Sequence, residues 1–197
     1  MSWICTLNEQ KANNILEFKE KSLSAPQTLN DLIRALSTSN KRFYPQLFQS
    51  IQFKPSDFDA YASWSEDCYV RNCIVDNENF ELILICWSFG QKTPIHDHGG
   101  EECWVKIIDG TLKETIYQKN KNGALKSIRS SISEINQVSY MKDFMGFHCL
   151  ENKANQRSMS LHLYAKPIRQ CNVFDEKSKS FTSKEMFYHT TPYLTTK

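Results

Sequence analysis

The stretch that decides the fold is Pro94-Ile95-His96-Asp97-His98-Gly99-Gly100-Glu101-Glu102-Cys103-Trp104. The chain contains only five histidines, and two of them stand here one residue apart. They follow an apolar run, Leu82 to Trp87, and precede a glycine pair and a cysteine. In an extended strand, residues two apart point to the same side of the backbone, so His96 and His98 project together while Asp97 points away.

A His-x-His pair on a strand forms a chelating pair, because imidazole nitrogen is a common ligand of transition metals. The alternative is that both are surface histidines on a turn, and for an isolated pair the two interpretations carry equal weight. A metal is favoured here because the pair follows an apolar run that predicts a buried strand and because two further histidines lie in strand-like sequence. We therefore predict a metal site that includes His96 and His98.

A third nitrogen has to come from elsewhere in the chain. His148, at the start of a predicted strand, is the leading candidate, and His162 competes with it. The alternation in Ser160-Leu161-His162-Leu163-Tyr164 places three polar residues on one face of a strand and leucines on the other. This polar face predicts the lining of a pocket, although a strand facing solvent would show the same pattern. His189 stands in a polar tail, where we expect a structural or solvated role.

Length and composition limit the class of protein. At 197 residues the chain fits one large domain or two small ones, and 40% apolar with 23% charged residues is ordinary for a globular protein. The net charge of +2 comes from 24 basic and 22 acidic residues mixed along the chain, so no basic surface for nucleic acid is predicted. We expect a small-molecule partner, no nucleic-acid partner and a monomer.

Neither the N-terminal residues nor the apolar runs predict membrane insertion. The first ten residues lack a basic start and a long apolar segment, and the longest apolar run, Leu82 to Trp87, is far too short to span a bilayer. Seven cysteines at irregular spacing include no Cys-x-x-Cys pair, so neither a disulfide framework nor a zinc knuckle is indicated. We therefore expect a cytoplasmic protein without a membrane partner.

The first third of the chain has helical patterns. Leu7 to Lys21 carries apolar residues among charged ones, and Thr28-Leu29-Asn30-Asp31 has the composition of a helix start. A third short helix is predicted from Ser56 to Trp64.

From Cys68 onward the pattern changes to short strands separated by turn signals such as Asp109-Gly110. The predicted strands are Cys68–Val75, Leu82–Phe89, Cys103–Ile108, Thr111–Tyr117, Gln137–Met141, Phe147–Leu150 and Ser158–Ala165. Such spacing favours a mainly β, antiparallel β-barrel or jelly roll with an N-terminal helical layer. We predict a single domain over 1–197, with a mostly helical part over 1–65, the β-barrel over 66–175 and a C-terminal segment over 176–197 that packs on the barrel.

These motifs resemble those of the cupin superfamily. Its first motif, Gly-x5-His-x-His-x4-Glu-x6-Gly, is matched at Gly90, His96, His98 and Gly110. Its second motif is echoed by Gly146-x-His148-x3-Asn152. Where the first motif has a ligand glutamate, this chain has Cys103, which is typical of the thiol dioxygenase branch of the superfamily.

Within that branch the chain resembles the cysteine dioxygenase family from about Tyr69 to His189. The stretches that carry the resemblance are Tyr69-Val70-Arg71-Asn72, Ile85-Cys86-Trp87, His96-Asp97-His98, Cys103, Gly146-Phe147-His148, Ser160-Leu161-His162-Leu163-Tyr164 and Cys171-Asn172-Val173-Phe174-Asp175. Their order and combination are specific. The resemblance implies a cupin-type fold and an iron-dependent enzyme that adds both atoms of dioxygen to the sulfur of L-cysteine, giving cysteine sulfinic acid.

The resemblance also implies that ferrous iron, Fe(2+), is held by His96, His98 and His148, with His162 outside the ligand set. Many non-heme iron oxygenases use two histidines and a carboxylate, whereas three neutral imidazoles leave the charge of the ion uncompensated. That charge favours a thiol substrate, because a thiol that coordinates a metal is deprotonated.

A protein-derived cross-link is implied as well. A thioether would join the sulfur of Cys103 to the ring of Tyr164, and Ser160 and His162 would complete a hydrogen-bonded chain to that tyrosine. The chain departs from the family just beyond Tyr164. Ala165-Lys166-Pro167 replaces a typical Ser-Pro-Pro, so the cis-proline that often follows the serine cannot form there.

Arg71, assisted by Tyr69, is implied to hold the substrate carboxylate, a role that suits the planar fork of a guanidinium. Without the resemblance, an ordinary surface ion pair would be the better interpretation of Arg71. The rival hypotheses are a dioxygenase for another small thiol, such as 3-mercaptopropionate or cysteamine, and a non-catalytic cupin that holds zinc or nickel. Arg71 favours cysteine among the thiols.

Overall fold

The computed structural model describes residues 25–192, so the predicted helix from Leu7 to Lys21 lies outside the described residues. The helical elements are α2 (Leu29–Thr38), η1 (Lys41–Phe43), α3 (Tyr44–Ser50), η2 (Pro55–Phe58) and η3 (Asp143–Met145), of which the three η elements are 3₁₀ turns. The strands are β1 (Val70–Asp76), β2 (Glu81–Trp87), β3 (Cys103–Asp109), β4 (Leu112–Lys119), β5 (Leu125–Ser133), β6 (Val138–Met141), β7 (Phe147–Glu151), β8 (Ser158–Tyr164), β9 (Gln170–Asp175) and β10 (Ser180–Glu185).

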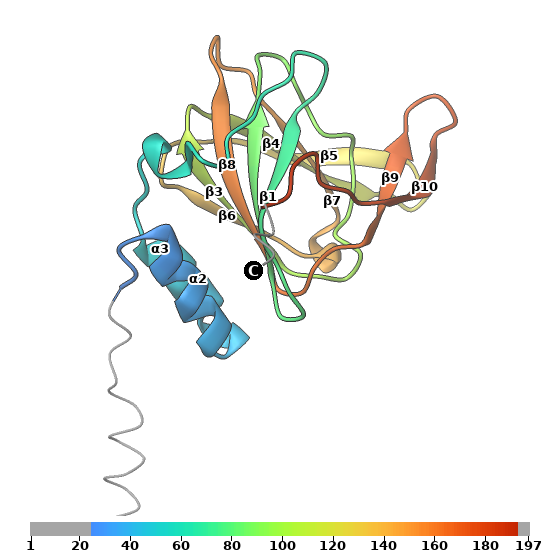
Figure 1. Ribbon diagram of the computed structural model, residues 1–197. Helices are drawn as coiled ribbons and strands as arrows, with labels where there is room; N and C mark the ends of the chain where they lie inside the picture. Colours follow the sequence, from blue (N-terminus) through green and yellow to red (C-terminus); the bar gives the residue numbers. More distant parts are fainter. Residues whose placement is uncertain (1–24, 193–197) are drawn as a thin grey trace, which may run out of the picture.

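The strands form antiparallel sheets (Figure 1). One sheet has the order β1-β2-β8-β3-β6, and the other strands pair as β5-β4-β7 and β10-β9. The segment around His96 connects these last two groups, because His96 is bridged to His148 of β7 and to Val173 of β9. The prediction of a mainly β, antiparallel jelly roll is confirmed, as two facing sheets rather than a closed barrel.

Strand β8 shows how the sheet separates the interior into two regions. Leu161 and Leu163 belong to the core between the five-stranded sheet and the helices, whereas Tyr164 belongs to the core between the two sheets. Every residue of β8 is buried. The predicted alternation along this strand is therefore confirmed, and the solvent-facing alternative for Ser160 and His162 is wrong.

The helical layer covers the outer face of the five-stranded sheet, on one side of the molecule (Figure 1). Helix α2 begins as predicted, since Thr28 accepts a hydrogen bond from the Asp31 N–H and the Asp31 carboxylate accepts one from the Thr28 N–H. Its buried face carries Leu32 and Leu36, which pack with Phe48 of α3. Among residues 25–192, no helix is long and apolar enough to cross a membrane.

Some elements differ from the prediction. Strands β5, β9 and β10 and helix α3 were not predicted, and the expected helix from Ser56 to Trp64 is only the short turn η2. Strands β5 and β10 are largely exposed and carry polar residues on both faces, so neither shows the alternation that marks a half-buried strand. β10 pairs along its whole length with β9, which attaches the C-terminal segment to the jelly roll.

A buried lysine connects the helical layer to the sheet. Lys106 of β3 is 1% exposed, and its ammonium group donates to the carbonyls of Phe48, Gln49 and Ile51 at the C-terminal end of α3. These carbonyls have no helical partner, because the last carbonyls of any helix lie beyond its final N–H groups. Burial lowers the pKa of Lys106, which makes the three carbonyl contacts important for its charged form.

We predict that Lys106→Met lowers the free energy of unfolding by about 1–3 kcal/mol, because methionine fills the same space but leaves buried carbonyl groups without a donor. Chemical denaturation measures the change. Lys126→Met, at an exposed position of β5, is the matched control and should be neutral. Equal stabilities of the two variants would contradict the proposed role of Lys106.

Candidate metal centre and active site

Backbone pairing places two of the predicted ligands side by side. The His96 N–H donates to the carbonyl of His148 at 2.9 Å, and the His148 N–H donates to the carbonyl of His96 at 2.9 Å. On the other side of this segment, the N–H of Phe174 in β9 donates to the carbonyl of Ile95 at 2.8 Å. The segment before His98 therefore lies between β7 and β9 as an additional strand-like element.

The imidazoles of His96, His98 and His148 converge on one point. Each offers a ring nitrogen, and the three nitrogens lie within 4.8 Å of one another. Nε2 of His98 and Nε2 of His148 are 3.0 Å apart. Two ligands at right angles around an ion, each about 2.1 Å from it, would lie about 3.0 Å apart, so the donor set fits a transition metal.

The outer nitrogens of these rings have different partners. Nδ1 of His96 lies 2.9 Å from the Pro94 carbonyl, and Nδ1 of His148 lies 2.7 Å from a carboxylate oxygen of Glu114. Burial, followed by the proximity of His148, lowers the pKa of His96 to about 3 and lowers the pKa of His98 strongly. Both rings are therefore neutral near pH 7, which is the form that binds a metal.

Two carboxylates hold the segment that carries the histidine pair. Asp97 points away from the metal site, as predicted, and accepts hydrogen bonds from the N–H of Asn172 at 2.8 Å and from its side-chain amide at 2.7 Å. Asp143 of η3 accepts from the N–H groups of His98 and Gly100, at 2.9 and 2.6 Å. Neither contact follows from the sequence pattern, because each joins segments at least 43 residues apart.

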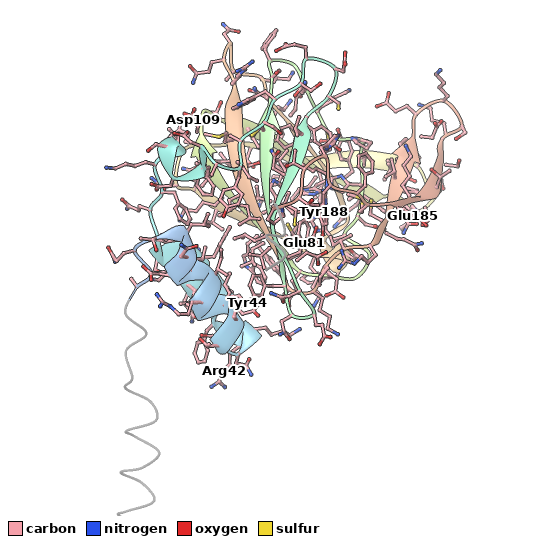
Figure 2. The ribbon with its side chains drawn as sticks, viewed as in Figure 1. Arg42, Tyr44, Glu81, Asp109, Glu185 and Tyr188 are labelled. Atoms are coloured by element: carbon pink, nitrogen blue, oxygen red, sulfur yellow. The ribbon has the colours of Figure 1, made fainter. Side chains whose placement is uncertain are left out.

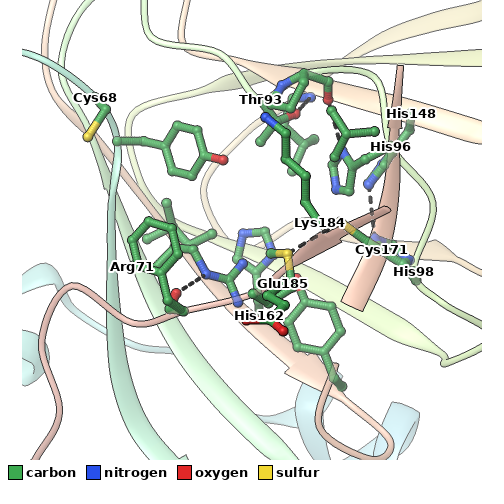
Figure 3. A pocket seen from close by; sticks show the side chains of 18 of the residues that line it. Cys68, Arg71, Thr93, His96, His98, His148, His162, Cys171, Lys184 and Glu185 are labelled. Carbon is green, nitrogen blue, oxygen red and sulfur yellow. Dashed lines mark hydrogen bonds between the residues drawn. The ribbon is translucent and has the colours of Figure 1, made fainter. Parts of the chain in front are cut away.

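The other predicted site residues lie around the same place. A cavity of about 260 Å³ is lined by Tyr69, Arg71, His96, His98, His148, His162 and Tyr164. Figure 3 shows His96, His98 and His148 grouped together, with Arg71 and His162 elsewhere on the cavity wall. Cys103 and Ser160 are fully buried behind this wall, next to Tyr164 and His162 respectively.

Sheet register places Cys103 of β3 directly opposite Tyr164 of β8. Both side chains are buried, and burial is the main reason that the pKa of each is raised. A thiol and a phenol are therefore neutral neighbours in the protein interior. Cross-strand neighbours have Cβ atoms about 4.5–5.5 Å apart, which brings the sulfur within reach of the ring.

The polar face of β8 is internally hydrogen-bonded. The hydroxyl of Ser160 accepts from the indole N–H of Trp87 at 2.9 Å and lies 2.9 Å from Nε2 of His162. The ring of His162 stacks against Tyr164, with centroids 6.2 Å apart and planes 25° apart. Trp87 fixes one end of this chain of side chains, and sequence reasoning did not assign it a role.

Arg71 is a buried cation on the cavity wall rather than a surface residue. Its Nε donates to the carbonyl of Phe187 at 3.1 Å, and its Nη2 has no hydrogen-bond partner among the described residues. Burial opposes the charge, but Tyr164 and Glu81 outweigh it, so the pKa of Arg71 is raised. Tyr69 lies nearby with its ring 5.0 Å from that of Trp87.

Glu81 is a residue of this site that sequence reasoning missed. It is fully buried at the start of β2, and its Oε1 lies 3.6 Å from Nη2 of Arg71. Its other carboxylate oxygen accepts a hydrogen bond from the Ile168 N–H at 2.9 Å. The Glu81 side chain also lies close to Tyr188 (Figure 2). The signal in the sequence was a glutamate that stands directly before the apolar run from Leu82 to Trp87.

The turn that follows Tyr164 has an unusual backbone. Lys166 adopts a φ of 109°, a region that favours glycine, and the residues 25–192 contain no cis peptide bond. His189, from the C-terminal tail, accepts a hydrogen bond from the Arg71 N–H at 3.0 Å. The tail therefore contacts the segment that carries Arg71.

A jelly roll with three converging histidines defines a metal-binding protein of the cupin class. The family model of cysteine dioxygenase type I matches residues 19–177, and this chain belongs to that family. The cysteine dioxygenase type 1 of Rattus norvegicus is 32% identical over 190 residues, covering 88% of this chain and 94% of the relative. That of Danio rerio is 30% identical over 181 residues, covering 86% and 90%.

A solved protein with a double-stranded β-helix domain, from Klebsiella pneumoniae, is also similar to this chain. It is 16% identical, with a TM-score of 0.46, and the match covers 65% of this chain and 88% of that protein.

We predict that Asp143→Ala weakens metal binding about 10–100-fold, as expected when a group that orients a ligand is lost, because His98 and Gly100 lose their shared acceptor. Competition with a chelator measures the affinity of the purified protein for Zn²⁺. Asp59→Ala, at an exposed position of the helical part, should leave the affinity unchanged. An unchanged affinity in Asp143→Ala would show that the segment holds its shape without this anchor.

Proposed function

We propose that this protein is an iron-dependent cysteine dioxygenase that converts L-cysteine and dioxygen to cysteine sulfinic acid. The observation that carries the proposal is that three converging imidazoles and the buried guanidinium of Arg71 line one small cavity. Membership of the cysteine dioxygenase family supports it. The reaction balances without a further reductant, because sulfur loses four electrons and dioxygen gains them.

The proposed iron ligands are His96, His98 and His148. Ferrous iron at this position would supply open coordination sites at which a thiolate and dioxygen meet, so that both oxygen atoms transfer to one sulfur. The low pKa values of His96 and His98 keep these rings free of a second proton, so they remain metal ligands in mildly acidic solution. We place His162 outside the set of metal ligands, because its Nε2 is hydrogen-bonded to the hydroxyl of Ser160.

We assign recognition of the substrate carboxylate to Arg71, with Tyr69 beside it. Nε of Arg71 donates to the carbonyl of Phe187 and Nη2 faces Glu81 at 3.6 Å, so the guanidinium is held in place on the cavity wall. A charged hydrogen bond in a buried place is stronger than one in water, because less solvent screens it. The small volume of the cavity suits a substrate of amino-acid size.

We predict that Arg71→Gln lowers kcat/KM for cysteine about 10–150-fold, which corresponds to one charged hydrogen bond of about 1.5–3 kcal/mol. Cysteamine lacks a carboxylate, so its turnover should be much less affected. Oxygen uptake with cysteine, cysteamine and 3-mercaptopropionate measures the effect, and Arg157→Gln at the surface is the control. The substrate assignment fails if cysteine is inert while another thiol turns over.

We further propose a thioether between Cys103 and Tyr164. The bond would form between the sulfur and a ring carbon, with loss of the thiol hydrogen and one ring hydrogen, and dioxygen would accept the two electrons. The direct cross-strand register supports the proposal. Ser160 and His162 would then hold the modified ring beside the cavity.

We expect intact-mass spectrometry after turnover to show a species lighter by two hydrogens, which is absent in Cys103→Ala and in Tyr164→Phe. Both variants should keep their iron, because neither residue is a proposed ligand. Both should turn over cysteine more slowly than the wild-type protein. Cys73→Ala, which removes a buried cysteine outside the cavity, should still form the lighter species. Loss of iron from Cys103→Ala would contradict the assignment.

The cytoplasmic location, the monomeric state and the single-domain layout stay predictions from the sequence.

A further inference from the structure

Glu114 is a buried carboxylate that neither the fold nor the proposed substrate site explains. It stands on the inward face of β4 between the buried residues Leu112 and Ile116, and it is 2% exposed. One oxygen, Oε1, lies 2.7 Å from Nδ1 of His148, and the other, Oε2, is buried without a hydrogen-bond partner. Within the described residues, His148 is its one ion-pair partner.

A purely structural role accounts poorly for this carboxylate. Leu112 and Ile116 fill the neighbouring inward positions with apolar side chains, and an apolar residue at position 114 would continue this pattern. Burying a carboxylate costs several kcal/mol unless a positive charge or several donors compensate it. The imidazole of His148 reaches this carboxylate through one nitrogen, Nδ1. A cation bound on the far side of that imidazole would supply the missing compensation.

The three histidines differ in the group that their Nδ1 atom contacts. Nδ1 of His96 faces a backbone carbonyl at 2.9 Å, Nδ1 of His98 is buried without a partner, and Nδ1 of His148 faces the full charge of Glu114. Donation from Nδ1–H to a carboxylate fixes the tautomer with the lone pair on Nε2 and makes that nitrogen a stronger ligand. Nε2 of His148 is the nitrogen that lies 3.0 Å from Nε2 of His98, in the metal site.

We propose that Glu114 is a positioning residue for the metal, which acts through His148 and gives the three-histidine set the negative charge that its ligands lack. The proposal rests on the proposed metal site but not on the identity of the substrate. Glu114 would raise the affinity for a divalent ion and stabilise the higher oxidation state of iron.

The test compares Glu114→Gln, which keeps the size and removes the charge, with Glu151→Gln. Glu151 lies on the same strand as His148, is partly exposed and pairs with Lys153. Chelator competition with Zn²⁺, in which no turnover is needed, should show a 10–100-fold loss of affinity in Glu114→Gln only. The Fe(III)/Fe(II) potential should become more positive in that variant, a change that a structural role would not produce.

An independent measurement uses the unmodified protein. With ¹⁵N-labelled histidine and bound Zn²⁺, NMR should show a proton on Nδ1 of His148 that is shifted further downfield than the Nδ1 proton of His96, because its acceptor is charged. If Glu114→Gln does not fold, this measurement decides alone. Equal metal affinities and potentials, or an unprotonated Nδ1 on His148, would overturn the proposal. If Glu114→Gln shows these changes in affinity and potential but the wild-type protein does not turn over cysteine, the proposed function is refuted and this inference stands.

Discussion

The site depends on one pair of backbone hydrogen bonds, the reciprocal N–H to carbonyl contacts between His96 and His148. They join segments about fifty residues apart and bring the two rings to 4.6 Å between centroids. His98 then follows without further adjustment, because a residue two positions along an extended chain points the same way. The metal centre is therefore a consequence of strand pairing, and the carboxylates of Asp97 and Asp143 stabilise the segment that supplies two of its ligands.

The residues whose role depends on local geometry could be predicted from the sequence. Alternation along a strand is a local property, so the polar face that includes His162 could be recognised, as could the paired projection of His96 and His98. The resemblance to the family added the prediction that Cys103 is a partner of Tyr164, and the register places the two residues opposite each other. The pocket face is buried because the second sheet packs against it, whereas the helices cover the leucine face of β8.

The contacts that depend on long-range pairing could not be predicted. Glu114 shows in the sequence only as a charged residue at an apolar position of a strand, and the sequence does not say that His148 is the group it meets. The expectation of an uncompensated metal charge was incomplete for this reason, since a carboxylate stands behind one ring. Strands β5 and β10 were missed because pairing with a neighbour, rather than burial of one face, defines them.

Strand β8 has a consequence for how preparations of this protein behave. Its inward positions carry Ser160, His162 and Tyr164, and its outward positions carry the leucines that hold the helices. A slip of one residue in its pairing would exchange the two sets, burying polar groups against the helices and turning leucines towards the cavity. A mispaired molecule would thus lose its chemistry and its core together, so specific activity would report the fraction of correctly folded chains.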